Sequence, residues 1–244
     1  MNITNIAKYI NQNIKQNLNY GVITGSGQYI MSKPIVTIPY TLIPGFINST
    51  VRGHSGEFNI YKINSSFILC ASGRFHYYEN KSYDDVTSII DIFHCLGINN
   101  IIISNSSGCI NKNWNLNKMM IIDSYFDTTL KIENTIIKKN IKVNKKYKRL
   151  AKECYTGTYA QVIGPTYETI SEIRMLESLN VDAVGMSTVP EIRKCINLQK
   201  DFIVICSLTN YAAGIVDSVP SHTEVLEEAG KLNKELNRLI KLII

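Results

Sequence analysis

The chain has 244 residues, of which 45% are hydrophobic and 19% are charged. This length can bury a full core in one domain, and the composition is that of a folded protein and not of a disordered one. No run approaches the roughly 18 apolar residues of a membrane span, and the Asn- and Gln-rich start lacks the pattern of a secretory signal. We therefore expect a cytoplasmic protein with no membrane partner.

The formal net charge of +6 is concentrated in one segment. Between Lys131 and Lys152 there are nine basic side chains and one acidic side chain, Glu133, so the segment carries +8 and the rest of the chain sums to −2. A basic run can contact phosphates of a nucleic acid, but no aromatic side chains interleave with this one in a stacking pattern. We expect a solvated helix face or loop, and no nucleic-acid partner.

The cysteines are scattered along the chain and form no C-x-x-C pair of the kind that binds zinc or carries out redox chemistry. They are Cys70, Cys95, Cys109, Cys154, Cys195 and Cys206. Several lie in apolar, strand-like runs, which predicts buried free thiols in a reducing compartment. No metal site is expected.

Short β-branched runs alternate with segments of helical periodicity, which is typical of an α/β protein. The predicted strands are Val22–Thr24, Ile35–Ile38, Phe67–Ser72, Ile101–Ser104, Met119–Ile122, Tyr155–Ile163 and Phe202–Leu208. There is neither an internal repeat nor a Pro/Gly-rich linker. We therefore predict a single domain over residues 1–244, with a central mixed, largely parallel sheet flanked by helices.

Periodicity and capping signals predict the main helices. The segment Tyr83–Leu96 places its apolar side chains on one face and is followed by Gly97. A Ser or Thr followed three residues later by Glu is a capping box. The capping boxes are Thr169–Glu172, whose helix runs to about Leu179, Thr188–Glu191, which has Pro190 in its first turn, and Ser221–Glu224.

Polar and glycine-containing clusters follow the predicted strands, at the strand ends where open α/β sheets bind ligands. The clusters are Gly25-Ser26-Gly27, Arg52–Gly56 with His54, Gly73–Tyr78, Asn105–Gly108, Gly164–Thr169, Asp182–Ser187 and Thr209–Gly214. Arg74 and His76 project to one side of an extended segment and can hold phosphate. Ser187 precedes a helix whose free amides favour an anion. Each cluster alone fits an ordinary turn, but together they suit a small polar substrate that carries or uses phosphate.

Four of these stretches resemble the trimeric purine nucleoside phosphorylases in residues, order and spacing. They are Gly73–His76, Gly164–Thr169, the run DAVGMSTVPE from Asp182 to Glu191, and Thr209-Asn210. The similarity extends from about Gly25 to the C-terminus, and the DAVGMSTVPE run is highly specific. The wider family includes the methylthioadenosine phosphorylases.

The resemblance implies reversible phosphorolysis, in which phosphate attacks C1′ of a purine nucleoside and releases the base and ribose 1-phosphate. It implies a homotrimer that needs no cofactor beyond inorganic phosphate as co-substrate. The implied phosphate-binding residues are Ser26, His54, Arg74, His76, Ser106 (through its amide) and Ser187. The implied nucleoside-binding residues are Tyr78, Asn105, Tyr167, Glu168, Val184, Met186, Thr209, Asn210 and His222. Within this set, Asn210, His76 and Glu168 would be the catalytic residues.

The side chains of Glu168 and Asn210 discriminate between purines. A 6-oxopurine presents N1–H and C6=O, which match a carboxylate acceptor and an amide donor, whereas a 6-aminopurine reverses both demands and leaves buried groups unpaired. The relatives that act on adenosine carry Asp where Asn210 stands. We therefore expect a preference for inosine, guanosine and their deoxy forms.

Two departures from the family pattern are evident. The sequence reads Asn105-Ser106-Ser107-Gly108-Cys109 where the family reads N-A-A-G-G, so that a serine hydroxyl either adds a phosphate donor or fills space. After Asp123, the family has a long loop with an N-P-L motif and an aromatic side chain lent to the neighbouring subunit. Here Tyr125 and Phe126 lead almost directly into the Lys-rich segment, which predicts a minimal version of the enzyme.

Three other functions remain open at this point. They are an adenosine or methylthioadenosine phosphorylase, a nucleoside hydrolase of the same fold that uses water in place of phosphate, and a purine-nucleoside- or nucleic-acid-binding protein that has lost turnover.

Overall fold

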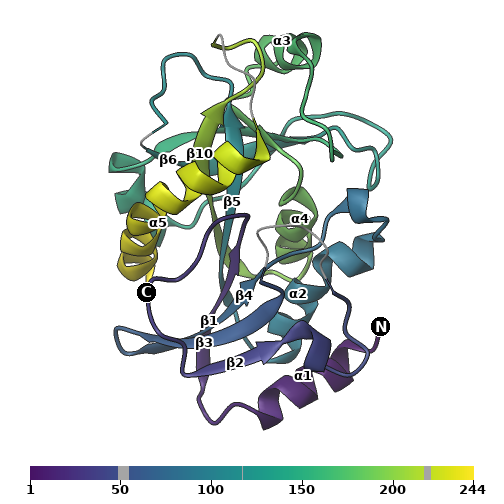
Figure 1. Cartoon of the computed structure of the whole chain (residues 1–244), viewed down its shortest axis with the longest axis vertical. Coiled ribbons are helices and arrows are strands. Elements are labelled where there is room, and N and C mark those ends of the chain that lie inside the picture. The colour runs from purple at the N-terminus through teal and green to yellow at the C-terminus, as the bar shows by residue number, and fades with distance from the viewer. Residues whose placement is uncertain (49–54, 117, 217–220) are drawn as a thin grey trace.

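One ten-stranded sheet organises the described residues, which are 1–48, 55–116, 118–216 and 221–244 of a computed structural model (Figure 1). The strands are β1 (Leu18–Thr24), β2 (Val36–Pro39), β3 (Glu57–Ile63), β4 (Ser66–Ser72), β5 (Asn100–Cys109), β6 (Met119–Asp127), β7 (Lys139–Asn140), β8 (Tyr155–Gln161), β9 (Ala183–Gly185) and β10 (Asp201–Tyr211). The α-helices are α1 (Ile3–Gln12), α2 (Tyr83–Cys95), α3 (Ile170–Ser178), α4 (Val189–Asn197) and α5 (His222–Ile243). Short 3-10 helices are η1 (Tyr40–Leu42), η2 (Tyr77–Glu79) and η3 (Lys145–Lys152).

The strand order is β10-β6-β8-β9-β5-β1-β4-β3-β2, with β7 beside β6. Because β5 also pairs with β10, the strands β5, β10, β6, β8 and β9 close into a ring that β1, β4, β3 and β2 extend. The pairs β1–β4, β1–β5, β5–β10, β6–β8 and β8–β9 are parallel, and antiparallel pairs complete the sheet. The predicted α/β fold with a central mixed sheet and flanking helices is confirmed.

Successive side chains of the central strands enter two different apolar layers. In β5, Ile102 packs with Leu236 and Ile240 of α5, whereas Ile101 and Ile103 pack in the core that contains α1, α2 and α4. Figure 1 shows α5 crossing one face of the sheet, with α1 and α2 gathered at its lower end. Because both faces are covered, the central strands are continuous apolar runs, the pattern from which the sequence predicted them.

The predicted strands all form, and further elements form that the sequence patterns did not predict. One of them is α1, which has apolar side chains at Ile3, Ile6 and Ile10 among its polar residues and is capped by Asn2, which accepts from Asn5 N. Others are β3, which forms a hairpin with β4, and the two-residue β7. The predicted strand over residues 155–163 ends at Gln161.

Two of the three predicted capping boxes form, those of α3 and α5, and the third, at α4, is wrong. Thr188 has φ of 91° and makes no side-chain capping bond. Instead Gln161, from the end of β8, accepts the hydrogen bond of Val189 N at 2.7 Å. Glu191 turns away from the helix terminus and bonds to Arg74. A tertiary partner has thus replaced a local cap, which a sequence motif cannot reveal.

The Lys-rich segment Lys131–Lys152 is anchored by buried side chains and displays its basic ones. Tyr147 and Leu150 of η3 pack in the same apolar layer as α5. Lys139 pairs with Glu133 and Lys146 pairs with Asp201, while the side chains of Lys138, Lys142, Lys145, Arg149 and Lys152 are exposed. This agrees with the expected solvated surface.

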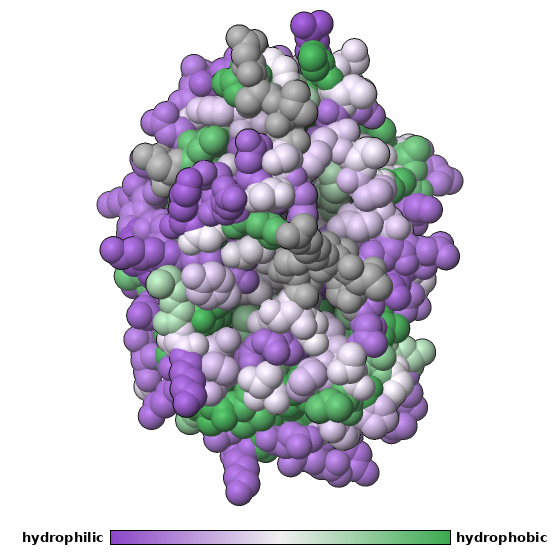
Figure 2. Space-filling model, in the orientation of Figure 1, coloured by the Kyte–Doolittle hydropathy of each residue, from purple (hydrophilic) through white to green (hydrophobic). Residues whose placement is uncertain are grey.

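Hydrophilic side chains cover most of the face seen in Figure 2, and apolar side chains gather over β2 and β3 at the sheet edge. Across the described ranges, no helix is both long and apolar enough to pass through a membrane. All six cysteines are free thiols, and Cys95 is the exposed one.

Two buried asparagines of α5 hold the chain that follows β1. Asn233 accepts from Tyr29 N and donates to Gly27 O, at 3.0 and 2.9 Å. Asn237 accepts from Met31 N and donates to Tyr29 O, at 2.8 and 2.9 Å. The backbone of residues 27–31 therefore forms its hydrogen bonds with side chains of a helix, in the way that a strand forms them with a neighbouring strand. These bonds fix the position of the Gly25-Ser26-Gly27 turn.

We predict that Asn233→Ala lowers the free energy of unfolding by about 1 to 3 kcal/mol, because it leaves a partly buried N–H and C=O without partners. Chemical denaturation measures the change. The neighbouring exposed variant Lys234→Ala is the control and should stay within about 0.5 kcal/mol of the parent protein. Equal stability of all three proteins would show that the asparagine bonds do not hold the turn.

Candidate active site

A pocket of about 330 Å³ lies where β1, β4, β5 and β10 end and where α4 and α5 begin. Fourteen of the fifteen site residues expected from the sequence line it. They are Ser26, Arg74, His76, Tyr78, Asn105, Ser106, Tyr167, Glu168, Val184, Met186, Ser187, Thr209, Asn210 and His222. The fifteenth, His54, lies outside the described residues. Segments separated by up to nearly two hundred residues thus converge on one cavity.

Both glycines around Ser26 are required by close packing. A side chain at Gly25 would come within 2.9 Å of the backbone of Asn105. Gly27 has φ of +72°, and a side chain there would come within 2.9 Å of Ala229 in α5. The Gly-Ser-Gly turn is therefore pressed between β5 and α5, which fixes Ser26 at the pocket.

Gln28, buried beneath this turn, is a residue that the sequence analysis did not single out. Its Oε1 accepts from Gly25 N at 2.8 Å and from Ser104 Oγ at 2.7 Å. Its Nε2 donates to Asn105 O and to Ser207 Oγ, both at 2.8 Å. One fully bonded amide thus ties the ends of β1, β5 and β10 together, and no local motif indicates it.

The serines that replace the alanines of the family pattern bond within the protein. Ser106 Oγ donates to Ser26 O at 2.9 Å, so this hydroxyl holds the turn. Ser107 Oγ donates to Asn105 Oδ1 at 2.8 Å, and Asn105 Nδ2 donates to Thr188 Oγ1 at 2.8 Å. Of the two alternatives left open for Ser106, the structure favours a structural role for the hydroxyl.

Arg74, which lines the pocket, belongs to a buried ion pair. Arg74 follows β4 and is 1% exposed, Glu191 of α4 is 2% exposed, and Arg74 Nε donates to Glu191 Oε1 at 3.1 Å. Arg74 Nη1 lies 3.4 Å from Ser187 Oγ. Burial raises the pKa of Glu191, and the adjacent guanidinium opposes that rise. The pair places a cation against the pocket without leaving its charge uncompensated.

Ser187 and Thr188 stand at the start of α4 in a constrained backbone. A φ of 91° is rare for a β-branched residue, and such conformations persist only where surrounding contacts enforce them. Tyr159 donates its hydroxyl to Ser187 O at 2.9 Å, and Asn105 holds the Thr188 hydroxyl. These contacts fix Ser187 beside Arg74.

The surroundings of His76 favour a neutral ring. Burial lowers its pKa, and its Nδ1 lies 3.1 Å from Glu79 Oε1. In the neutral form, Nδ1–H donates to Glu79 and Nε2 is an acceptor. The ring stacks on Tyr78 with centroids 4.7 Å apart, so the two residues act as one rigid unit of the pocket wall.

Glu168 and Asn210 supply opposite hydrogen-bonding functions to the pocket. Glu168 is partly buried, and this burial raises the pKa of its carboxyl group. Asn210 Oδ1 accepts from Thr209 Oγ1 at 2.9 Å, and Asn210 Nδ2 donates to Tyr211 O at 3.0 Å. These bonds fix the amide orientation and leave Asn210 one further N–H. The register of β10 against β5 shifts between Leu208 and Asn210, and this irregularity brings Asn210 opposite Gly108.

The segment after Asp123 does not reach this pocket. Tyr125 and Phe126 are 2% and 7% exposed and belong to the core. Among the described residues, none of Lys131–Lys152 lines the pocket. The aromatic pair that stands where the family has its long loop is therefore part of this chain's own interior.

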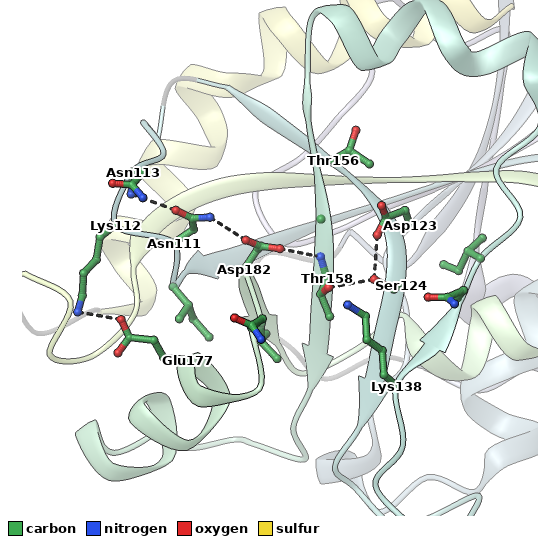
Figure 3. A pocket seen from close by; sticks show the side chains of 16 residues that line it. Asn111, Lys112, Asn113, Asp123, Ser124, Lys138, Thr156, Thr158, Glu177 and Asp182 are labelled. Carbon is green, nitrogen blue, oxygen red and sulfur yellow. Dashed lines mark hydrogen bonds and ion pairs between the residues drawn. The ribbon is translucent and has the colours of Figure 1, made fainter.

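A larger cavity, of about 850 Å³, lies elsewhere, beside β6 and β8 (Figure 3). Several of its polar side chains bond to one another. Asp182 accepts from Asn111 Nδ2 at 2.8 Å and from Thr158 N at 2.9 Å, and Lys112 pairs with Glu177 at 2.8 Å. None of the predicted site residues lines it within the described ranges. It is therefore separate from the candidate site.

The described side chains include no group of three or more His, Cys, Asp or Glu residues placed to hold a metal ion. What the smaller pocket provides is one buried cation, hydroxyl and amide donors, a neutral imidazole, a carboxylate and a carboxamide. This set can bind an anion next to a polar heterocycle.

The chain is similar to known enzymes over nearly its whole length. Residues 19–244 match the phosphorylase superfamily. Purine nucleoside phosphorylase 1 of Geobacillus stearothermophilus is 31% identical, with 99% of this chain and 96% of that protein covered. The enzyme of the same name from Bacillus subtilis is also 31% identical, over 99% and 97%.

The solved structures give the same result. Purine nucleoside phosphorylase of Schistosoma mansoni in complex with inosine superposes with a TM-score of 0.86 at 25% identity, over 99% of this chain and 94% of that one. With the fold and the pocket, these similarities establish that the chain belongs to the purine nucleoside phosphorylases, which are pentosyltransferases of the phosphorylase superfamily.

Proposed function

We propose that this enzyme carries out the reversible phosphorolysis of 6-oxopurine nucleosides, inosine, guanosine and their deoxy forms, and so serves purine salvage. The observation that carries the proposal is the pairing of Glu168, an acceptor, with Asn210, whose remaining N–H is a donor, in the pocket that also holds Arg74. A 6-oxopurine offers the complementary N1–H and C6=O. Solved structures of the Schistosoma mansoni relative contain inosine in one case and adenosine in another, so they support a purine nucleoside as substrate, and the 6-oxopurine preference rests on Glu168 and Asn210.

The phosphate would bind against Arg74, with donors from Ser26, Ser187, the Ser106 amide and the N-terminus of α4. Guanidinium and hydroxyl donors suit an oxyanion, and helix-terminal amides favour negative charge. His76, with Nε2 as an acceptor, would receive a hydrogen bond from a protonated phosphate oxygen. His54 belongs to the same proposal by resemblance alone.

The reaction forms a bond from a phosphate oxygen to C1′ and breaks the bond from C1′ to N9, whose electron pair passes to the purine. The ribosyl group has oxocarbenium character in the transition state, and the bound phosphate dianion stabilises its charge while acting as nucleophile. The negative charge on the leaving purine would be stabilised by the amide of Asn210. Because the pocket holds both reactants in the orientation of the reaction, it lowers the entropic part of the activation barrier, by an amount on the order of several kcal/mol.

The remaining contacts would position the nucleoside. Tyr167 would stack on the purine, and Tyr78, Met186 and His222 would line the ribose, with His222 near the 5′-hydroxyl. Asn105, Val184 and Thr209 would complete the nucleoside pocket. Thr209 also orients the amide of Asn210.

The proposal includes a cytoplasmic homotrimer. Free cysteines throughout the chain support a reducing compartment. Exposed apolar side chains on α3 and near the pocket, Ile163, Ile170 and Met175, support a contact between subunits.

We predict that consumption of inosine requires phosphate and yields hypoxanthine and ribose 1-phosphate in equal amounts. Product analysis with and without phosphate measures this. Ribose formed without phosphate would identify a hydrolase instead, and binding of inosine without turnover would identify a binding protein.

We predict that Asn210→Asp lowers kcat/KM for inosine by about 100-fold, because an acceptor then faces the purine oxygen, and raises it for adenosine. The exposed variant Asn11→Asp in α1 makes the same chemical change away from the pocket and should leave the ratio of the two substrates unchanged. An unaltered ratio in Asn210→Asp would rule out the role assigned to this amide.

We predict that the affinity for hypoxanthine in the absence of phosphate decreases as the pH falls through the pKa of Glu168. This pKa lies above its ordinary value of 4.5 because the carboxyl group is partly buried, and protonation removes the negative charge that strengthens the hydrogen bond from N1–H. Calorimetric titrations across the acidic range test this. Glu168→Gln should bind weakly and without that pH dependence. An identical pH profile in both proteins would contradict the prediction.

A further inference from the structure

We infer that Glu191 is a positioning residue for phosphate, which aims the guanidinium of Arg74 into the pocket. The inference rests on the proposed phosphate site and adds to it a residue that does not line the pocket. The sequence motif assigns Glu191 to helix capping, and the structure assigns it a different partner.

The geometry of the contact is specific. Glu191 Oε1 accepts from Arg74 Nε at 3.1 Å, on the inner edge of the guanidinium, while Nη1 lies 3.4 Å from Ser187 Oγ at the pocket. Because the carboxylate engages Nε, it does not occupy the outer Nη edge, whose Nη1 lies beside Ser187 at the pocket, where an oxyanion would accept from it. A carboxylate bound to the two Nη atoms would block that edge.

The surrounding structure makes Glu191 available for this contact. In the capping box expected from the sequence, its carboxylate would bond back to the Thr188 backbone. Here Gln161 bonds to Val189 N, so the helix terminus is satisfied from β8. Glu191 is the third residue of α4 and is 2% exposed, with its carboxylate directed at Arg74.

Because Arg74 is buried, its guanidinium depends on Glu191 for both charge compensation and orientation. Arg74 has a long side chain that is 1% exposed, and a buried cation without a paired anion is strongly unfavourable. Glu191 therefore compensates the charge of the guanidinium and holds it in place before phosphate arrives. Its own negative charge also opposes that of the incoming dianion, so the carboxylate orients Arg74 while moderating the affinity for phosphate.

Two variants of Glu191 separate orientation from charge. Glu191→Leu removes the acceptor, and we expect it to weaken phosphate binding by about 100-fold, the effect of misplacing a binding group by about 1 Å. Glu191→Gln keeps an oxygen acceptor and removes the charge, so its phosphate affinity should equal or exceed that of the parent protein. Calorimetry with inorganic phosphate alone measures both, and the KM values for phosphate and inosine provide a second readout.

The control is another Glu–Arg pair, in which α4 supplies the arginine. Glu133 Oε1 accepts from Arg193 Nη2 of α4 at 2.7 Å, away from the pocket. Glu133→Leu should leave the affinity for phosphate unchanged. In the Arg74→Ala background, Glu191→Leu should add little further loss, because both changes act on one contact.

The outcomes separate this inference from the proposed function. Three results would overturn the positioning role. The first is an unchanged phosphate affinity in Glu191→Leu, and the second is an equal loss of affinity in Glu191→Gln and Glu191→Leu. The third is a loss of phosphate affinity that occurs only together with a proportional rise in the KM for inosine. Phosphate binding by the parent protein without phosphorolysis would overturn the proposed function and still test Glu191 by calorimetry. Absence of phosphate binding by the parent protein would overturn both.

Discussion

The buried pair of Arg74 and Glu191 is the constraint around which the pocket is arranged. A guanidinium that is 1% exposed must have an anion beside it, and the anion comes from α4, more than a hundred residues further along the chain. This requirement fixes the start of α4 against the end of β4. The same start of α4 is also held by Gln161, which accepts from Val189 N, and contains Thr188 with φ of 91°.

The sheet supplies the framework that makes the pair possible. The strands that contribute to the pocket run parallel through β4, β1, β5 and β10, so their carboxyl ends meet at one edge. Closure of the ring through β5 and β10 brings β9 and the start of α4 to the same edge. Gln28 then joins three strand ends through one amide, and α5 holds the adjoining turn through Asn233 and Asn237. Anion-binding groups and purine-binding groups are placed by the same strand ends.

The polar groups of the two cavities differ in how they are used. In the larger cavity, Asp182 has both carboxylate oxygens bonded to its neighbours. In the smaller one, Asn210 retains an N–H beyond its bonds, and Glu168 is desolvated and forms no ion pair within the described part of the chain. Size alone would have selected a different cavity, because two others, of about 850 and 860 Å³, are larger than this one of about 330 Å³. The distribution of hydrogen bonds separates scaffold from site.

Much of the fold and the site could be predicted from local patterns. A few neighbouring residues suffice to indicate the continuous apolar strands, the capping boxes of α3 and α5, and the polar clusters at strand ends. The family resemblance identified fourteen of the residues that line the pocket. The elements missed were those with weak local signals, such as α1 with its many asparagines and the hairpin strand β3.

By itself, the sequence determined the type of each element and the chemical groups available, because periodicity, capping and side-chain chemistry are properties of short segments. Only the tertiary structure decided which groups became partners. Glu191 has the spacing of a local cap and became the counter-ion of Arg74, Gln28 and Gln161 have no motif and became central hydrogen-bonding residues, and Ser106 turned its hydroxyl to the backbone of Ser26. The physical reason is that a buried charge or amide must be satisfied by whatever polar group the folded chain places beside it.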